Sequence, residues 1–296
     1  MREKQLINII KEETNSKYIG DDCAYIKNFG ITVTQDNLVE DIHFSLRYAS
    51  AYQIGWKSAA VNISDICASG AKPEYLTIGL SLPNYVDEKF VKEFYEGAKD
   101  AAKDAEIIGG DITGSDKLFI SITAIGSDKG RKISSRSNAK KGYKVIVSGE
   151  HGNSAMGLKL LSENKLEKNI FTDSHLMPKA QIKFSKEIAE NIDCDYAMMD
   201  TSDGLADALY QIALASDVKI SIDTLKIPHN SLVSMEQVLY GGEDYQLIAC
   251  VPEKILNKIT NYYIIGEVIS DGFGLEIDKK SINNVDDKIF NHFGKN

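Results

Sequence analysis

Segments with the pattern of strands and segments with the pattern of helices alternate along almost the whole chain. The strand-like segments are short, rich in β-branched residues and bounded by turn residues; they cover residues 31–35, 75–82, 118–125, 143–148, 218–222, 246–251 and 262–268. The helix-like segments cover residues 52–69, 87–105, 154–161, 178–191 and 205–216. This alternation predicts an α+β fold.

The length of 296 residues suits two domains better than a single core. Residues 127–142 are polar and basic and have no apolar period, which is typical of a linker or a mobile loop. We therefore predict two α+β domains of similar size, residues 1–140 and residues 141–296.

The charge balance and the cysteines limit the partners that the chain can have. Asp and Glu number 43 against 34 Lys and Arg, a net charge of −9, and only a short basic cluster occurs near residues 129–141. A nucleic-acid-binding protein usually carries a basic stripe. No apolar run could cross a bilayer, residues 1–14 lack the apolar core of a signal peptide, and the four cysteines stand far apart. We expect a cytoplasmic protein that binds neither nucleic acid nor membranes.

Six short acidic motifs are spread along the chain, and each is predicted to lie where a strand or loop runs into a turn. They are Gly-Asp-Asp at 20–22, Thr-Gln-Asp at 34–36, Asn-Ile-Ser-Asp at 62–65, Gly-Gly-Asp at 109–111, Met-Asp-Thr-Ser-Asp-Gly at 199–204 and Gly-Gly-Glu-Asp-Tyr at 241–245. A carboxylate beside glycine or a small hydroxyl residue suits a hard divalent cation, and the glycine permits close approach of a phosphate. Together the motifs predict a metal-lined phosphate site.

Most of these motifs, taken singly, have an ordinary structural explanation. Aspartate beside glycine is most often a turn residue, and Ser202 or Asp203 could simply cap the helix that begins at 205. Asp65 is different, because it lies in a mostly apolar helix where an unpaired carboxylate is costly. A buried acid of this kind needs a partner cation, a metal ion or a shifted pKa.

The sequence contains no P-loop, no dinucleotide-binding fingerprint and no protein-kinase catalytic loop. If the protein uses ATP, Mg²⁺ held by carboxylates must therefore contribute much of the phosphate binding.

In their order along the chain, these motifs resemble those of the thiamine-monophosphate kinases, which share a superfamily with aminoimidazole ribonucleotide synthetase and selenophosphate synthetase. The resemblance runs from about residue 20 to the C-terminus. The residues that carry it are Asp-Asn-Leu-Val-Glu-Asp-Ile-His-Phe at 36–44, Ala-Val-Asn-Ile-Ser-Asp at 60–65 with Gly-Ala-Lys-Pro at 70–73, Met-Asp-Thr-Ser-Asp-Gly-Leu at 199–205 and Gly-Gly-Glu-Asp-Tyr at 241–245.

The resemblance implies a homodimer in which the N-terminal domains share a β-barrel and a C-terminal α/β domain folds against each. It also implies that ATP gives its γ-phosphoryl group to thiamine monophosphate with the help of several Mg²⁺ ions. The positions that match the family's metal ligands are Asp22, Thr34, Asp36, Asp65, Asp111, Asp200 and Asp203. The positions that match nucleotide contacts are Tyr95, Gly110, Asp111, Arg136 and Ser202. The positions that match substrate contacts are His43, Glu243 and Phe290.

The expected chemistry agrees with this residue set. A phosphate acceptor is already largely ionised at neutral pH, so no strong general base is needed, and cations relieve the repulsion between donor and acceptor. Without the resemblance, Arg136 would be interpreted as a solvated loop arginine, His43 as a packed or surface imidazole and Phe290 as a packing residue.

The chain departs from the family pattern at two positions. Gln35 stands where a Thr or Ser hydroxyl is usual, although its amide oxygen could still reach a metal directly or through water. Ile112 follows Asp111 where a second hydroxyl residue is usual, which affects how the nucleotide is held. Neither change removes a carboxylate.

Two other interpretations remain open from the sequence. The first is a sister enzyme that uses the same metal–ATP core on another acceptor; residues 1–19 and the last residues, 293–296, lack the reactive cysteines expected of selenophosphate synthetase and of the hydrogenase-maturation enzymes. The second is a non-catalytic regulator that binds Mg-nucleotide, which the complete set of carboxylates disfavours.

Overall fold

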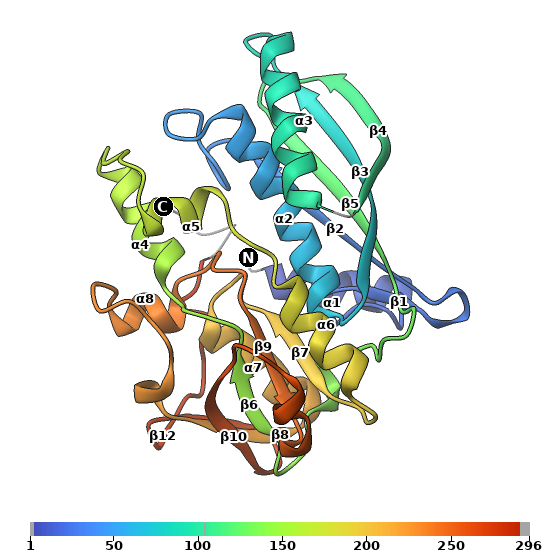
Figure 1. Ribbon diagram of the computed structural model, residues 1–296, viewed down its shortest axis with the longest axis vertical. Helices are drawn as coiled ribbons and strands as arrows, with labels where there is room; N and C mark the ends of the chain where they lie inside the picture. The colour runs from blue at the N-terminus through green and yellow to red at the C-terminus, as the bar shows by residue number, and fades with distance from the viewer. Residues whose placement is uncertain (1–2, 104, 291–296) are drawn as a thin grey trace.

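The computed structural model describes residues 3–103 and 105–290, which form two β-sheets with helices packed on them (Figure 1). The first sheet has five strands in the order β1-β2-β5-β3-β4. Its strands are β1 (Ala24–Ile26), β2 (Ile31–Val39), β3 (Lys72–Leu82), β4 (Glu106–Gly114) and β5 (Phe119–Ser127). Neighbouring strands are antiparallel except β3 and β4, which are parallel. The sheet is open, with β1 and β4 at its edges.

Helix α2 (Ala51–Ala68) packs on the first sheet and is buried along nearly its whole length. A capping box fixes its start, because Ser50 accepts from the Gln53 N–H and the Gln53 side chain accepts from the Ser50 N–H. Its neighbour is α3 (Glu88–Ala102), which packs very close to it. A Cβ at Gly55 would lie 1.9 Å from the carbonyl oxygen of Phe94, so only glycine permits this approach.

The second sheet has seven strands in the order β12-β11-β8-β10-β6-β9-β7. Its strands are β6 (Lys144–Val147), β7 (Ala197–Asp200), β8 (Val218–Ile222), β9 (Leu247–Val251), β10 (Tyr263–Asp271), β11 (Gly274–Ile277) and β12 (Lys280–Ser281). The remaining helices are α1 (Glu3–Thr14), α4 (Asn153–Ser162), α5 (Ile170–Leu176), α6 (Ile182–Asn191), α7 (Leu205–Ser216) and α8 (Met235–Tyr240). Among the helices of residues 3–103 and 105–290, none has the length and apolar character that a membrane span requires.

Strand β6 and the edge strand β7 of the second sheet are buried on both faces. Ile146 and Met198 belong to a core that also contains residues of α2 and the first sheet. Val147 and Met199, their neighbours in sequence, belong to a second core with residues of α7. Burial on both sides explains why these strands are apolar throughout, and it means that the two sheets share one core across α2.

The predicted α+β character and most of the predicted segments agree with these elements, but the expectation that every acidic motif lies at a turn is wrong. Residues 34–36 lie inside β2, which continues to Val39, and residues 109–111 lie inside β4. The pattern of residues 106–114 does not predict a strand, since an exposed edge strand with two adjacent glycines shows neither alternation nor a continuous apolar run.

Residues 128–142, nearly all of the predicted linker or mobile loop, contain no strand but are fixed to their surroundings. The Ser134 N–H donates to the Ser69 carbonyl at 2.9 Å, and the Ser134 hydroxyl donates to the Ala68 carbonyl at 2.6 Å. The Lys132 N–H donates to the Ala189 carbonyl of α6 at 2.8 Å. These bonds tie the segment to the end of α2 and to α6, so it is a tethered connection and not a loose one.

Gly110 in β4 is expected to be necessary for the pairing of β3 and β4, because a Cβ there would lie 1.8 Å from the Ile78 carbonyl oxygen. Gly110→Ala should therefore lower the free energy of unfolding by about 2 kcal/mol or more. Gly114→Ala in the same strand is the matched control, since no atom lies within 4 Å of its Cβ position. Thermal unfolding of both variants measures the effect, and equal melting temperatures would contradict the close pairing.

Candidate functional site

Three carboxylates from distant parts of the chain meet between α2 and the end of β7. Asp22 precedes β1, Asp65 lies in the last turns of α2, and Asp200 is the last residue of β7. Each of the three offers an oxygen that lies within 4.8 Å of the oxygens offered by the other two. Carboxylate oxygens are the ligands that hard divalent cations such as Mg²⁺ prefer. We call this group the carboxylate cluster.

Neighbouring hydroxyl groups hold two members of the carboxylate cluster in place. Thr34 Oγ1 on β2 donates to Asp65 Oδ2 at 2.6 Å. Ser64 Oγ on α2 donates to Asp200 Oδ2 at 2.7 Å. Such supporting bonds orient carboxylates before a cation binds. Thr34, predicted as a ligand from the resemblance, is thus in contact with the cluster.

The electrostatics of the carboxylate cluster favour a bound cation. Burial raises the pKa of Asp65 well above its ordinary value, and the nearby charges of Asp36, Asp200 and Asp22 raise it further. Burial raises the pKa of Asp200 to about 7, with a further contribution from Asp22. A divalent cation among these groups would stabilise their ionised forms, because it is the largest local charge. The donor set therefore fits a hard divalent metal ion.

Arg136, predicted to contact nucleotide phosphate, lies beside the carboxylate cluster. Its Nη2 donates to Asp22 Oδ1 at 3.0 Å and its Nε donates to Asp22 Oδ2 at 3.3 Å. Burial opposes the charge of Arg136, but Asp22 outweighs burial, so the pKa of Arg136 lies above its ordinary value. The guanidinium is therefore a fixed positive charge at the edge of the cluster.

Asp36 on β2 is close to the carboxylate cluster, since its charge contributes to the raised pKa of Asp65. Its backbone N–H donates to Asn62 Oδ1 of α2 at 3.0 Å, which fixes β2 against the helix.

Ser202 and Asp203 follow Asp200 in the loop before α7. The Ser202 N–H donates to Asp200 Oδ1 at 3.3 Å. Helix α7 begins after Gly204, which occupies the N-cap position with a φ of 106° and has no side chain to cap the helix. The N-cap position is therefore held by neither Ser202 nor Asp203.

Gln35, predicted as a metal ligand, lies on the other face of β2. Side chains alternate along a strand, so Gln35 points away from the face that carries Thr34 and Asp36. Its Oε1 accepts from Thr123 Oγ1 on β5 at 3.0 Å. The structure does not bring this side chain to the carboxylate cluster of the same chain.

Asp111 is likewise separate from the carboxylate cluster within one chain. It is exposed on the edge strand β4. The register places it in the row of Gly79, Ser121 and Asn37, on the face of the sheet that also carries Gln35. The neighbouring Gly110 has a structural explanation, because only glycine permits the close approach of β4 to β3 at this position. The role of Gly110 as a nucleotide contact therefore stays a prediction.

Two of the three residues predicted to bind substrate, His43 and Glu243, are brought together by a lysine that the sequence pattern did not single out. Lys57 Nζ on α2 donates to the His43 carbonyl oxygen at 3.0 Å and forms an ion pair with Glu243 Oε1 at 2.9 Å. Only 4% of the Lys57 side chain is exposed. Lys57 could have been found from the sequence, because a lysine in a mostly apolar helix is as unusual as Asp65 in the same helix.

The second oxygen of Glu243 lies 3.2 Å from Nδ1 of His175 on α5. Ser154 Oγ on α4 lies 3.0 Å from the same nitrogen. Burial raises the pKa of Glu243, but the neighbouring, positively charged Lys57 ammonium more than offsets burial, so the pKa of Glu243 is lowered from its ordinary value. Burial lowers the pKa of His175 to about 3, so its imidazole is neutral at physiological pH. Glu243 is thus an ionised group held by two buried partners.

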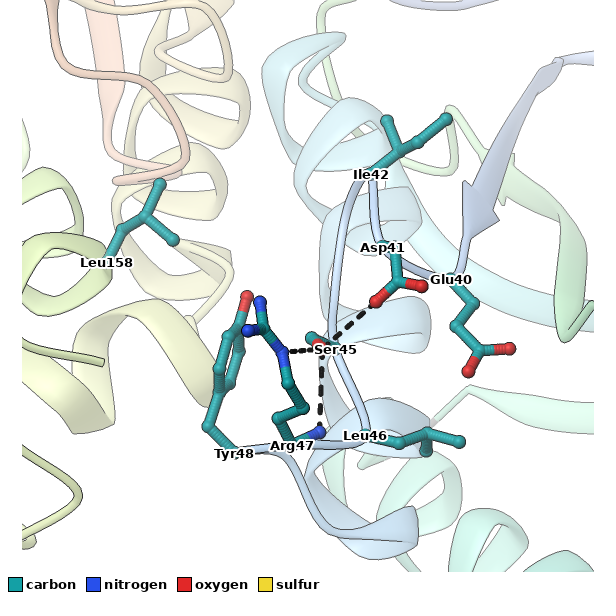
Figure 2. A pocket seen from close by; sticks show the side chains of 8 residues that line it. All are labelled: Glu40, Asp41, Ile42, Ser45, Leu46, Arg47, Tyr48 and Leu158. Carbon is teal, nitrogen blue, oxygen red and sulfur yellow. Dashed lines mark hydrogen bonds between the residues drawn. The ribbon is translucent and has the colours of Figure 1, made fainter. Parts of the chain in front are cut away.

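A cavity of about 590 Å³ is lined by residues that follow β2 and by Leu158 of α4 (Figure 2). In Figure 2, Leu158 faces Tyr48 and Arg47 across the cavity, and Ser45 is hydrogen-bonded to both Asp41 and Arg47. The ring of Tyr48 meets that of His175 edge-on, with centroids 6.5 Å apart. The cavity is therefore adjacent to the Glu243–His175 contact and has room for part of a small molecule.

Two predicted contact residues lie elsewhere. Tyr95 is half-buried on α3 and meets Phe94 edge-on at 5.5 Å. Phe290 is 57% exposed at the end of the described residues. Their nucleotide and substrate roles stay predictions.

The chain is similar in sequence and in structure to known proteins. The family models for AIR synthase related protein, N-terminal domain and C-terminal domain, match residues 20–127 and 140–278. The chain is 36% identical to the thiamine-monophosphate kinase of Aquifex aeolicus, over 97% of each chain. It is 38% identical to that of Bacillus subtilis, over 79% of this chain and 77% of the relative. The solved structure of AaThiL complexed with AMPPCP and TMP matches with a TM-score of 0.90 at 34% identity, covering 99% of this chain and 97% of that one.

Proposed function

Because the chain belongs to the thiamine-monophosphate kinase family, we propose that it transfers the γ-phosphoryl group of ATP to thiamine monophosphate, giving thiamine diphosphate and ADP. The observation that carries the proposal is the carboxylate cluster. Buried acids that repel one another fit an enzyme that handles two phosphorylated substrates through metal ions.

We assign the bound cation as Mg²⁺, held by Asp22, Asp65 and Asp200. When bound, Mg²⁺ supplies positive charge that offsets the phosphate charges. Asp36, Thr34 and Asp203 belong to the surroundings of this site. Gln35 and Asp111 are left out of the ligand set within one chain, since they lie on the other face of the first sheet.

The side chains around the cation site have positioning roles in this proposal. Arg136 contributes a fixed charge near the nucleotide phosphates, and Ser202 lies in the loop that would approach them. His43 and Glu243 hold the acceptor beside the cavity of Figure 2. The acceptor phosphate is already ionised, so none of these groups has to act as a strong base.

We further propose a homodimer that buries the edge strand β4. An unpaired strand edge is a template for pairing with another chain, and Ile108 and Ile112 on β4 are 52% and 58% exposed. The division into residues 1–140 and 141–296 and a cytoplasmic location also belong to this proposal; the four free cysteines suit a reducing compartment.

The proposed function is tested by measuring thiamine diphosphate formation and ADP release by the purified protein with Mg·ATP. We expect product with thiamine monophosphate and none with free thiamine, because free thiamine carries no phosphate to accept the γ-phosphoryl group. Binding of Mg·ATP without turnover on either compound would point to a sister enzyme or a regulator.

Glu243→Ala is expected to raise the KM for thiamine monophosphate at least tenfold and to change the KM for ATP much less. The reason is that Glu243 belongs to the acceptor side of the site, where loss of a charged hydrogen-bonding group costs about 1.5–3 kcal/mol. Glu236→Ala on the surface of α8 is the matched control. Steady-state kinetics in both substrates decide the matter, and an equal rise of the two KM values would remove Glu243 from the acceptor side.

A further inference from the structure

Lys57 is a buried cation in an apolar helix, and no part of the cation site uses it. Its ammonium contacts two groups that come from different parts of the chain, the His43 carbonyl and the Glu243 carboxylate. Breaking a buried ion pair is costly, because the remaining charge is left without a partner. A lysine in this position therefore has a strong influence on where Glu243 lies.

Glu243 is constrained from several directions besides Lys57. Its backbone has a φ of 65°, in the left-handed region, and its N–H donates to the Ser202 carbonyl at 2.7 Å. His175 contacts its second oxygen. The side chain of Glu243 is nevertheless 26% exposed, and a carboxylate has lone pairs beyond those used here. It can therefore accept one more hydrogen bond from a ligand.

One face of α2 contacts both Glu243 and the carboxylate cluster. Lys57 and Ser64 are seven residues apart, which is two helical turns, so they lie on the same face and about 10 Å apart along the axis. Lys57 holds Glu243, whereas Ser64 donates to Asp200 of the carboxylate cluster. Helix α2 therefore sets the distance between Glu243 and the cluster, and Figure 1 shows the helix running from the first sheet toward β7.

We propose that Lys57 is a positioning residue that determines acceptor affinity, by holding Glu243 and the His43 turn at a fixed distance from the carboxylate cluster. The inference rests on the proposed function, because the acceptor is taken to be thiamine monophosphate. This fixed distance selects the length of the acceptor. An acceptor of matching length places its phosphate at the carboxylate cluster and its other end at Glu243, whereas a shorter acceptor cannot reach Glu243.

The test compares Lys57→Met, Glu243→Gln and the double variant, with Lys89→Met on the exposed surface of α3 as the matched control. Lys57→Met should raise the KM for thiamine monophosphate at least tenfold and leave the KM for ATP and kcat within about twofold. The KM of the double variant for thiamine monophosphate should be no higher than that of the more impaired single variant, because both substitutions remove the same Lys57–Glu243 interaction. A parallel rise of both KM values, or multiplied effects in the double variant, would overturn the proposal.

A pH profile separates positioning from a merely structural role. Since Lys57 lowers the pKa of Glu243, its removal should move the acidic limb of kcat/KM for the acceptor to higher pH. An unchanged limb would count against the proposal. If Lys57→Met does not fold, Lys57→Gln is used, which keeps a donor for the His43 carbonyl but lacks the charge.

Calorimetric binding of thiamine monophosphate gives a readout that does not need turnover. If the wild type binds it without turning over, the proposed function fails, and the ratio of dissociation constants between wild type and Lys57→Met still decides the role of Lys57. If the wild type does not bind thiamine monophosphate, both proposals fail. Equal dissociation constants for the two proteins would refute the role of Lys57 alone.

Discussion

Asp65→Asn is expected to reduce turnover at least about 10³-fold while the protein stays folded. Asp65 is the member of the carboxylate cluster that α2 supplies, and an amide oxygen is a much weaker ligand for Mg²⁺ than a carboxylate. Loss of one preorganised electrostatic contact in an active site typically costs 10²–10³ in rate, and a cation lost from the site costs more. The measurement is single-turnover thiamine diphosphate formation at saturating Mg·ATP.

The fold of this variant should not suffer, because the substitution removes a buried charge that its neighbours repel. Circular dichroism and thermal unfolding without Mg²⁺ check this, and Asp116→Asn in an exposed loop is the control for a simple loss of surface charge. Activity of Asp65→Asn close to that of the wild type would show that the cation is held elsewhere.

Stabilisation by Mg²⁺ is expected to grow strongly with pH between about 5 and 8. The folded-state pKa values of Asp65 and Asp200 are raised, to about 7 for Asp200, above the value of 3.8 for an ordinary Asp. In the metal-free protein these groups favour folding at low pH, and their contribution is lost as pH rises through the raised pKa values. Mg²⁺ binds the ionised forms, so it restores stability only where protons no longer compete.

The melting temperature with and without Mg²⁺ should be compared at each pH. The melting temperatures with and without Mg²⁺ are compared because His151 and His175 also make the total stability depend on pH. Burial lowers the pKa values of these two histidines to about 4 and about 3, so their contribution to stability rises with pH, whereas that of Asp65 and Asp200 falls. Below pH 7 the Mg²⁺ affinity should rise about tenfold per pH unit for each proton released. The increase should be much smaller in Asp65→Asn, and a Mg²⁺ effect independent of pH would rule out ionisation of buried carboxylates as its source.

The sequence pattern was most informative where burial and periodicity agree. The boundaries of α7 and β8 were predicted correctly, because each is an apolar run with clear punctuation. The short strand β7 was missed, since four residues, Ala-Met-Met-Asp, carry no period. Edge strand β4 was missed for the opposite reason, because its exposed surface removes the apolar signal.

For the candidate site, the sequence indicated which residues have unusual chemistry, but it did not indicate which side chains lie close together in space. Its apolar helix alone predicted that Asp65 has a partner cation, a metal ion or a shifted pKa, and burial and the neighbouring acids do raise its pKa. Which face of β2 carries Gln35 depends on the register of the strand against α2, which spacing along the chain does not specify. Lys57 was missed because its role depends on Glu243, 186 residues away in the chain.

The origin of the carboxylate cluster has a consequence for synthesis of the protein. Asp22 and Asp65 lie in the part of the chain that leaves the ribosome first, whereas Asp200 follows 135 residues after Asp65. Translation adds about 5–20 residues per second, so the nascent chain carries two of the three carboxylates for roughly ten seconds before the third exists. The three-carboxylate site is therefore incomplete while the first sheet and α2 emerge, and the face of α2 that packs on β7 is covered only after β7 has been made.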